Sequence, residues 1–398
     1  MKRILLINSV FGYGSTGRIV EDVYEKLDKS NVFEAYAIVG RKKPIYNSET
    51  YNKNHIYCVY NKYLLIINMI KSILFKNHGL NNKVQTYKII KLIKKIKPDI
   101  IHVHNLHGFY INYEILFDYI KSTNIKVVMT LHDCWEFTGY CTYYTGIKCK
   151  KWRDGCIKCK EWRSYPYRIP GNISKNYYKK QQVFNIDNIE KLIVPTFWLK
   201  NEIEFSLLKD KECNVIYNGV NPNYFKLDRE IIKEIDGKKI LLGVANVWDK
   251  RKGLDYYIKL SYFLPEDYKI IIIGLSKNQL RMYKSNDKIE FKGKQKYIED
   301  LVYYYRRAKF LLNFSIDESF SLVNLESQMC GTPVISLDGG GNGETAKLFG
   351  ETLDDFDIQK ILEIINNKNE NSYVNHSFEY TTTRMINKNI EIYNKLKL

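Results

Sequence analysis

The sequence has little proline and lacks any long apolar run without charge. Its 398 residues include only 8 prolines, while 45% are hydrophobic, which excludes a disordered chain. The most apolar stretch, Tyr63–Phe75, contains Asn68 and Lys71 and is too short to cross a bilayer. The apolar run Ile4–Ile7, directly after Met-Lys-Arg, lacks the length of a signal peptide. We therefore expect a folded, cytoplasmic protein.

Acidic residues are scarce in the first half of the chain. Residues 1–200 contain 33 lysines and arginines against 15 acidic residues, whereas residues 201–398 contain 29 of each, so the whole net charge of +18 arises in the first half. Such an asymmetry favours an anionic partner: nucleic acid, a membrane surface or a phosphate-bearing substrate. A lysine- and isoleucine-rich composition without a specific partner is the alternative. The basic half contains no recognisable nucleic-acid-binding module, so we expect no nucleic-acid partner.

Internal repeats and low-complexity linkers are also absent, and short β-type runs alternate with helical patterns. This alternation is typical of parallel α/β sheets. We expect two sheets of about six strands each, with a boundary near residues 196–214. The expected domains are residues 1–205, with a cysteine-rich insert at about 134–160, and residues 206–376. A helical pattern at 377–398 follows them.

Parallel sheets bind ligands at the carboxyl ends of their strands, so the residues after each strand are informative. The expected strands are Arg3–Asn8, Glu34–Val39, Ile56–Val59, Asp99–His104, Lys126–Leu131, Leu192–Val194, Val215–Tyr217, Lys239–Val244, Lys269–Ile273, Ile289–Phe291, Phe310–Asn313 and Pro333–Ser336. Polar, charged and glycine residues follow them at 12–17, 132–133, 246–253, 314–322 and 338–344. We therefore expect two domains that face each other across a ligand-binding cleft.

The turn after the first strand matches the pattern G-x-G-x-x-G. It consists of Gly12, Tyr13, Gly14, Ser15, Thr16 and Gly17 and precedes a helical pattern. Glycines let the backbone approach an anionic group at a helix N-terminus. The second strand ends in Gly40-Arg41-Lys42, where NAD binding would require an acidic residue, so an NAD(P)-dependent oxidoreductase is only an alternative. A glycine turn without a ligand is another.

Two cations and two carboxylates follow strands of the second half. Arg251 and Lys252 suit a diphosphate, although a solvated basic turn is the competing interpretation. Glu326 falls in an expected helix that Gly331 ends, and its carboxylate suits a ribose diol. Glu318 precedes backbone N–H groups that suit phosphate or sugar oxygens. By themselves the two glutamates also fit a glycosidase pair and, most simply, a helix with surface carboxylates.

Four of the seven histidines lie at expected strand ends of the first half, namely His102, His104, His107 and His132. The H-x-H pair at 102–104 also fits zinc, but only if the strand is unbroken. We interpret one or two of the four as core or turn residues. His132, followed by Asp133, is the better candidate for a catalytic or hydroxyl-orienting group.

Four cysteines cluster in the first half with the spacing C-x7-C-x6-C-x2-C, at Cys141, Cys149, Cys156 and Cys159. Only one C-x-x-C pair is present, so a structural zinc site and unligated thiols both remain open. Neighbouring lysines and arginines would help to hold thiolates in their charged form. Disulfides are not expected in a cytoplasmic protein.

The stretch Tyr63–Phe75 carries lysines at 62, 71 and 76. It fits an amphipathic helix that lies on an anionic membrane, and an ordinary packed helix is the alternative. The basic surplus of the same half favours peripheral association with the inner membrane face.

Taken together, these residues resemble glycosyltransferase family 4, whose members are retaining enzymes with the GT-B architecture of two Rossmann-like domains. The most specific element is E-x7-E, here Glu318 and Glu326, followed by Gly-Thr-Pro-Val at 331–334. In the family the first glutamate lies at the donor sugar and the second binds the nucleotide ribose. Arg251-Lys252-Gly253 resembles the family segment whose cation holds the donor diphosphate, and the chain after Ser377 resembles the segment that crosses back to the first domain.

The resemblance implies a set of site residues. Those implied for donor binding are Asn246, Arg251, Lys252, Glu318, Ser319, Phe320, Ser321, Leu322 and Glu326. Gly14, Ser15, Thr16 and Gly17 would form the acceptor or phosphate loop, and Glu318, His132 and Lys252 would be catalytic. The chain departs from the family at Val247, where an arginine is frequent, and at Ser-Phe-Ser 319–321, where Gly-Phe-Gly is usual.

The segment His132–Gly139 resembles a subgroup assigned to bacterial surface polysaccharides of the colanic-acid and capsule type. The resemblance implies transfer of a hexosyl unit from a UDP- or GDP-sugar to a glycan or lipid-linked oligosaccharide, with retention at the anomeric carbon. Protein cations would replace a divalent ion at the diphosphate, so no cofactor is expected for catalysis. A GT-B epimerase or phosphorylase is the alternative that shares this architecture.

Overall fold

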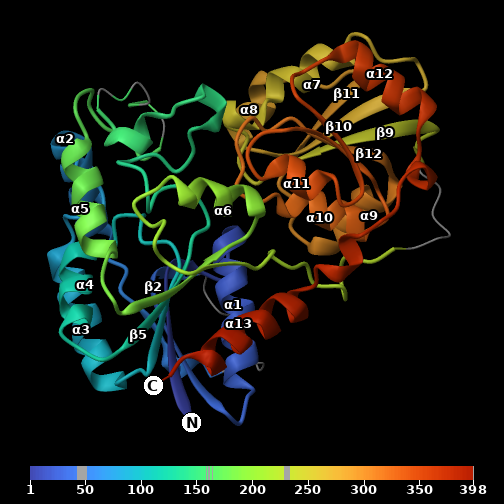
Figure 1. Ribbon diagram of the computed structural model, residues 1–398. Coiled ribbons are helices and arrows are strands. Elements are labelled where there is room, and N and C mark those ends of the chain that lie inside the picture. The colour runs from blue at the N-terminus through green and yellow to red at the C-terminus, as the bar shows by residue number, and fades with distance from the viewer. Residues whose placement is uncertain (43–51, 158, 160–161, 164, 228–233, 398) are drawn as a thin grey trace. The chain divides into compact units, whose positions relative to one another are not determined.

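The computed structural model describes residues 1–42, 52–157, 159, 162–163, 165–227 and 234–397. It consists of two units, Met1–Ile216 together with Ile386–Leu398, and Tyr217–Met385. Each unit contains one mainly parallel β-sheet with helices packed on it (Figure 1). The α/β class expected from the sequence is therefore confirmed.

The first unit is built on a parallel sheet in the order β3-β2-β1-β4-β5-β6-β7. Its strands are β1 (Lys2–Phe11), β2 (Phe33–Lys42), β3 (Ile56–Cys58), β4 (Ile100–Val103), β5 (Lys126–Thr130), β6 (Ile189–Val194) and β7 (Cys213–Val215). Its helices are α1 (Gly14–Asp28), α2 (Lys62–Phe75), α3 (Lys83–Ile96), α4 (Tyr113–Lys121), α5 (Ser174–Phe184) and α6 (Phe197–Glu204). The strand order reverses between β1 and β4, and ligands of such sheets bind at this switch point.

The second unit repeats the plan with the order β11-β10-β9-β12-β13-β14, and β8 pairs antiparallel with β9. Its strands are β8 (Glu234–Ile235), β9 (Lys238–Val244), β10 (Tyr268–Leu275), β11 (Ile289–Gly293), β12 (Ala308–Asn313), β13 (Val334–Leu337) and β14 (Gly350–Leu353). Its helices are α7 (Leu254–Ser261), α8 (Lys277–Met282), α9 (Ile298–Arg307), α10 (Leu322–Met329), α11 (Asn342–Ala346) and α12 (Ile358–Asn367). Here the switch point lies between β9 and β12.

The central strands are apolar on both faces because helices cover both sides of each sheet. Ile4–Ile7 in β1 are fully buried, and Ile270–Ile273 in β10 are at most 2% exposed. Such continuous runs cannot sit in a sheet with one wet face, where every second residue would be polar. Each unit therefore has its own apolar core, in agreement with the division of the chain.

The expected strand set needs two corrections. Val215–Tyr217 was expected to open the second sheet, but β7 pairs in parallel with β6 and belongs to the first. The first unit accordingly extends to Ile216, beyond the expected boundary at 205. The short strands β8 and β14 were not expected at all. Local periodicity cannot tell which sheet a three-residue strand will join, because that depends on long-range packing.

The C-terminal helix α13 (Thr382–Lys395) returns to the first unit, as the resemblance implied. Tyr393 near its end is fully buried and lies edge-on to Phe33, with ring centroids 6.3 Å apart. Its hydroxyl lies 2.5 Å from Nδ1 of the buried His102, the first of the four histidines at strand ends. His102 is thus a core residue that anchors α13.

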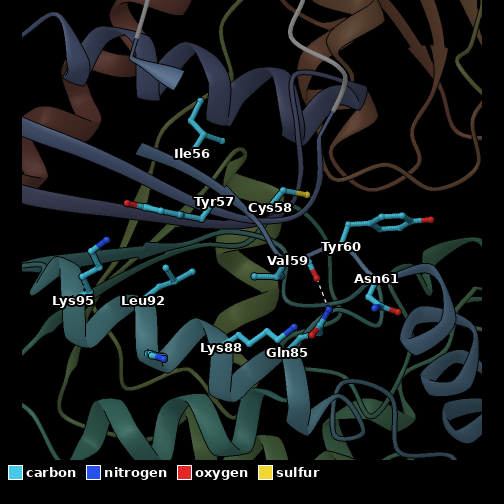
Figure 2. A pocket seen from close by; sticks show the side chains of 11 residues that line it. Ile56, Tyr57, Cys58, Val59, Tyr60, Asn61, Gln85, Lys88, Leu92 and Lys95 are labelled. Atoms are coloured by element: carbon cyan, nitrogen blue, oxygen red, sulfur yellow. Dashed lines mark hydrogen bonds between the residues drawn. The ribbon is translucent and has the colours of Figure 1, made fainter. Parts of the chain in front are cut away.

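A hollow of about 750 Å³ lies beside β3, at the edge of the first sheet. Its lining comes from residues 56–61 and from one side of α3, as Figure 2 shows. Three lysines of α3 line it, Lys88, Lys91 and Lys95, together with Gln85 and Leu92. None of the site residues implied by the resemblance takes part, so this hollow is a separate feature of the first unit.

Candidate active site

The turn that carries the two cations is tied to the loop after β12. Arg251 and Lys252 lie in the short 3-10 turn Lys250–Lys252, which follows β9. The Ile316 N–H donates to the Arg251 carbonyl at 3.0 Å. Gly253 ends the turn with φ +67°, and a Cβ there would lie 2.5 Å from the Phe314 carbonyl oxygen. Only glycine permits so close an approach in this conformation.

Replacing Gly253 with alanine should therefore destabilise the second unit. A side chain in the left-handed region costs roughly 1–2 kcal/mol, and the contact with Phe314 adds about as much again. Gly237→Ala is the matched control, because Gly237 has φ +69° but nothing within 4 Å of its added Cβ. Urea unfolding should show the larger loss of free energy for Gly253→Ala. Equal losses would mean that the packing of this turn against Phe314 is loose.

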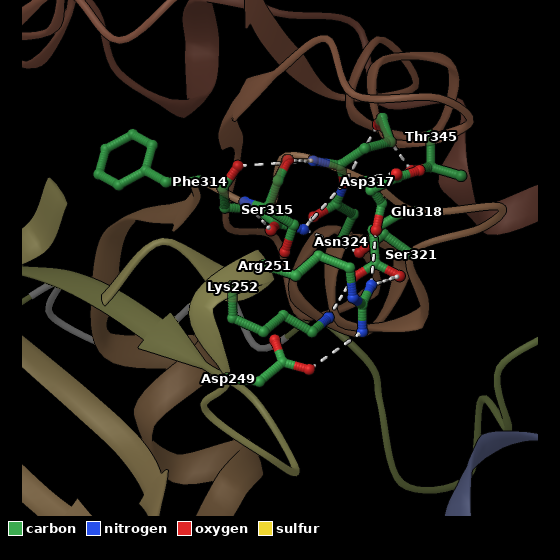
Figure 3. A network of polar contacts seen from close by, with 12 residues as sticks. Asp249, Arg251, Lys252, Phe314, Ser315, Asp317, Glu318, Ser321, Asn324 and Thr345 are labelled. Atoms are coloured by element: carbon green, nitrogen blue, oxygen red, sulfur yellow. Dashed lines mark hydrogen bonds and ion pairs between the residues drawn. The ribbon is translucent and has the colours of Figure 1, made fainter. Parts of the chain in front are cut away.

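Glu318 is the centre of an ion-pair cluster at the switch point of the second sheet (Figure 3). The Lys252 Nζ donates to Glu318 Oε1, and Arg251 Nη1 lies 3.5 Å from Glu318 Oε2. Arg251 also donates to the Asp317 carbonyl at 2.5 Å and lies 3.9 Å from a carboxylate oxygen of Asp249. The Glu318 side chain is 9% exposed, and those of Arg251 and Lys252 are 25% and 18% exposed. The cations therefore reach solvent while the carboxylate is held below them.

The charge state of Glu318 follows from these neighbours. Burial by itself would raise the pKa of its carboxyl group, but the charges of Lys252 and Arg251 outweigh burial and hold the pKa below its usual value. Glu318 is thus ionised at neutral pH. A buried carboxylate with two cations forms an arrangement in which an incoming anion can compete for the cations.

The backbone around Glu318 is also held in place. Its N–H donates to the Gly339 carbonyl at 3.2 Å, and its carbonyl accepts from the Gly341 N–H at 2.6 Å. These bonds join the loop after β12 to the glycine-rich loop after β13. Both neighbouring strand ends therefore fix the position of the carboxylate.

A network of buried amides and hydroxyls lies beneath the same loop. Asn313 Nδ2 donates to the side chains of Ser321, Asn324 and Asn342 at 2.8, 2.7 and 2.9 Å. Asn324 Nδ2 in turn donates to Thr345 Oγ1 at 3.0 Å. All five side chains are at most 5% exposed. A buried polar group without a partner costs about 1–3 kcal/mol, so this network strongly favours one conformation of the loop.

Glu326 lies inside helix α10, one turn after the loop. Its side chain is 5% exposed, and its Oε2 accepts from the Tyr305 hydroxyl at 2.9 Å. The helix ends at Met329, and Gly331 follows it with φ +78°, in agreement with the expected glycine stop. Neither Glu318 nor Glu326 is a surface carboxylate. The alternative that they belong to a helix with surface carboxylates is therefore wrong.

The other implied donor residues divide into two groups. Ser319, Phe320 and Ser321 are at most 8% exposed and lead from Glu318 into α10, which begins at Leu322. The first N–H groups of any helix lack intrahelical partners, and those of α10 begin four residues after Glu318. Asn246 instead has an exposed side chain, which accepts from Lys294 Nζ at 3.0 Å. Asn246 is therefore not part of the ion-pair cluster.

The first unit contains the remaining implied residues. His132 follows β5, is 7% exposed, and its Nε2 lies 2.9 Å from Nδ1 of His104. Burial lowers the pKa of His132 to about 4, although Asp133 opposes this, so the imidazole is neutral at pH 7. Asp133 Oδ2 in turn lies 2.9 Å from Nε2 of His107. A neutral imidazole has one nitrogen that donates a hydrogen bond and one that accepts, so it can orient a hydroxyl group.

The glycine turn of the first unit opens helix α1. Gly12 and Gly14 have φ +76° and +67°, and the Gly12 N–H donates to the Gly17 carbonyl at 3.0 Å. Helix α1 begins at Gly14, so Gly14, Ser15 and Thr16 form its first turn, where backbone N–H groups are available to an anion. Gly17 is buried against Val10, and Ser15 is exposed.

The four clustered cysteines lie in one region of the first unit. Cys156 Sγ accepts from the Gly139 N–H at 3.2 Å, and a hydrogen bond with Cys159 is the main cause that raises the pKa of Cys141. In the part of the chain that the structure describes, no group of three or more His, Cys, Asp or Glu side chains is placed to hold a metal ion. A structural zinc at Cys141, Cys149, Cys156 and Cys159 stays a prediction.

Comparison with known proteins explains this arrangement. The family model described as "Glycosyltransferase Family 4" matches residues 59–224, and that described as "Glycosyl transferases group 1" matches residues 226–382. The chain is a glycosyltransferase that contains both of these family domains. The two models meet close to the boundary between the structural units at Ile216.

The curated proteins similar to this glycosyltransferase include one from a cps region and one named for the O-antigen chain. It is 26% identical to an uncharacterized 41.2 kDa protein in the cps region of Klebsiella pneumoniae, over 77% of this chain and 81% of that one. It is 24% identical to the O-antigen chain mannosyltransferase RfbU of Salmonella typhimurium, over 44% of this chain but only 49% of the relative. The chain therefore spans about half the length of this second relative.

Solved structures agree on the fold. HepE of Anabaena, crystallised with UDP, superimposes with a TM-score of 0.66 over 100% of both chains at 14% identity. The sequence identity is too low to transfer more than the architecture. The glycosyltransferase thus has the GT-B fold that the resemblance implied.

Proposed function

We propose that this glycosyltransferase transfers a hexosyl unit from a nucleoside-diphosphate sugar to a glycan or lipid-linked acceptor, with retention at the anomeric carbon, in the synthesis of a bacterial surface polysaccharide. The observation that carries the proposal is the Arg251–Lys252–Glu318 cluster at the switch point of the second sheet. Ligands of such sheets bind at this point, and two partly exposed cations side by side match a diphosphate. The relatives in cps and O-antigen systems support the proposed pathway.

Each residue has a distinct part in this proposal. Lys252 and Arg251 would turn from Glu318 to the diphosphate and stabilise the charge that develops on it as the sugar leaves. Glu326, oriented by Tyr305, would accept hydrogen bonds from the ribose hydroxyls. Glu318 would position the donor sugar. His132, as a neutral imidazole of the first unit, would orient the attacking hydroxyl of the acceptor.

The nucleotide is proposed to be uridine or guanosine diphosphate. HepE, with the same fold, was crystallised with UDP and with UDP-glucose, which supports uridine as the first choice. Protein cations would supply the positive charge that a divalent ion provides in other transferases. Donor binding and transfer should accordingly persist in EDTA.

The test is a thermal-shift panel of UDP, GDP, ADP, their sugar conjugates and NAD(P), measured in EDTA. One nucleoside diphosphate and its sugar should stabilise the wild-type protein, and NMR of the product should show the donor's anomeric configuration. Stabilisation by NAD(P) alone would overturn the proposal in favour of an oxidoreductase. Turnover of the donor without a glycan acceptor, or with phosphate, would favour an epimerase or a phosphorylase.

Glu326→Ala should weaken binding of the stabilising nucleotide about 10- to 100-fold, because hydrogen bonds to a charged group are each worth roughly 1.5–3 kcal/mol. Isothermal titration calorimetry measures this directly. Glu363→Ala is the control, because Glu363 is an exposed carboxylate of α12. The affinity of Glu326→Ala for the acceptor should be the same as that of the wild-type protein. A variant that binds donor and acceptor equally poorly would contradict the ribose-binding role.

A further inference from the structure

Helix α2 presents several large apolar side chains to solvent, while its two buried residues are polar. Two of its residues are buried, Asn68 and Ser72, and both are polar. Ser72 Oγ lies 3.1 Å from the hydroxyl of Tyr140 in the interior. The exposed side chains include six large apolar ones, Tyr63, Ile66, Ile67, Ile70, Leu74 and Phe75, which are 39–77% exposed. This is the reverse of an ordinary surface helix, whose apolar stripe faces the core.

The exposed residues form a continuous stripe. Positions 63, 66, 67, 70 and 74 follow the spacing of one helix face, opposite the buried Asn68 and Ser72. At about 100° per residue, the exposed Lys62 and Lys71 fall on the two flanks of the stripe. When a partner covers the apolar stripe, long lysine side chains at its flanks can extend to anionic groups of that partner.

The apolar surface continues beyond the helix. The Ile169 N–H donates to the Ile73 carbonyl at 3.2 Å, which places the segment Tyr165–Ile169 against the end of α2. Tyr167 and Ile169 are 57% and 40% exposed. Contiguous apolar patches of this kind mark interaction surfaces in proteins. We name the set of Tyr63, Ile66, Ile67, Ile70, Leu74, Phe75, Tyr167 and Ile169 the α2 face.

The charge around the α2 face selects among partners. Residues 52–98 contain ten lysines and no aspartate or glutamate. Lys88, Lys91 and Lys95 line the hollow beside β3, whose lining also includes Asn61, the residue that caps the start of α2 (Figure 2). Two copies of this basic surface would repel each other, which disfavours self-association. An anionic surface is attracted by it.

From these observations we propose that the α2 face docks on an anionic lipid surface. The apolar stripe enters the boundary between headgroups and acyl chains, and the lysines on its flanks contact lipid phosphates. Among the described helices none is long and apolar enough to span a membrane, so the contact is along the surface. The proposal does not depend on the identity of the donor or the acceptor.

The test is co-sedimentation of the full-length protein, without nucleotide, with vesicles of phosphatidylcholine alone or with added phosphatidylglycerol. Wild type should bind only the anionic vesicles, and added salt should weaken this binding. Ile70→Glu with Leu74→Glu should reduce binding at least about tenfold, since two apolar anchors become charged. The matched control is Tyr262→Glu with Phe263→Glu, at side chains of the second unit that are 77% and 55% exposed. It adds the same charge and should leave binding unchanged.

Other outcomes overturn the proposal in defined ways. Equal loss of binding in both double variants would mean that net charge alone drives the interaction. Absence of wild-type binding, with a dimer in sedimentation velocity that Ile70→Glu with Leu74→Glu makes monomeric, would identify a second copy as the partner. Absence of both would mean that the α2 face has no lipid role. The thermal shift that the donor induces in Ile70→Glu with Leu74→Glu is measured as well. A normal shift without vesicle binding would mean that the transferase site is intact and that only lipid binding is lost.

Discussion

Lys252→Ala should lower kcat/KM for the nucleotide-sugar by about 10²- to 10³-fold, the usual effect of removing one fixed charge from a developing anion. Lys252 Nζ bonds to Glu318 and is 18% exposed, so it is well placed to move to a bound diphosphate. Its loss should weaken binding of the nucleoside diphosphate and slow the chemical step as well. Steady-state kinetics and calorimetry on one preparation measure both effects.

The control for this variant is a neighbour in the same turn. Lys250 belongs to the same 3-10 turn and has an exposed side chain, so Lys250→Ala removes an equal charge outside the ion-pair cluster. It should change kcat/KM by less than about threefold, as expected for a solvated surface charge. If both variants lose activity equally, the general positive field of the turn, and not Lys252, holds the donor.

Glu318→Gln should separate catalysis from binding. The amide keeps the shape of the side chain but removes the charge that now pairs with Lys252 and Arg251. The two cations are then less neutralised, so the nucleoside diphosphate should bind as tightly as to wild type or more tightly. We expect kcat to fall at least about 10²-fold, because in the proposed mechanism the Glu318 carboxylate positions the donor sugar. Single-turnover kinetics and calorimetry together resolve the two effects.

Protonation of Glu318 removes the same charge as Glu318→Gln, and it should do so only in acid. The pKa of Glu318 is held below its usual value, so the carboxylate stays charged as the pH falls from neutral to its ordinary pKa. Wild-type donor affinity should therefore be independent of this group over that range. A Glu318→Gln variant that loses nucleotide affinity in proportion to kcat would show that the carboxylate has a structural role, keeping the cations in place.

The periodicity and composition of the chain were enough to predict its architecture. Continuous apolar runs such as Ile270–Ile273 indicate strands buried on both faces, and their alternation with helical patterns indicates parallel sheets. The errors lie where the local signal is weakest. Strands β7, β8 and β14 are four residues or shorter. Strand β7 belongs to the first sheet, although it was expected in the second.

The composition of the candidate site was predictable, but its contacts were not. Lys252 and Glu318 both follow strands, yet they are 66 positions apart in the chain. They meet because β9 and β12 are neighbours in the sheet, and strand order depends on long-range packing. The amide network of Asn313, Asn324 and Asn342 was missed altogether. Single asparagines form no periodic pattern, and only folding buries them together.

The sequence by itself determined the two α/β units, the polar residues at their strand ends and the excess of positive charge in the first half. Each of these follows from local spacing or simple composition. Only the tertiary structure decided that Glu318 and Glu326 are buried, and that helix α2 turns its apolar stripe to solvent. An amphipathic helix can bury either face, and the choice depends on which neighbours the rest of the chain provides. Here the interior offers Ser72 of α2 a hydroxyl partner in Tyr140, and Ile66, Ile67 and Ile70 remain exposed.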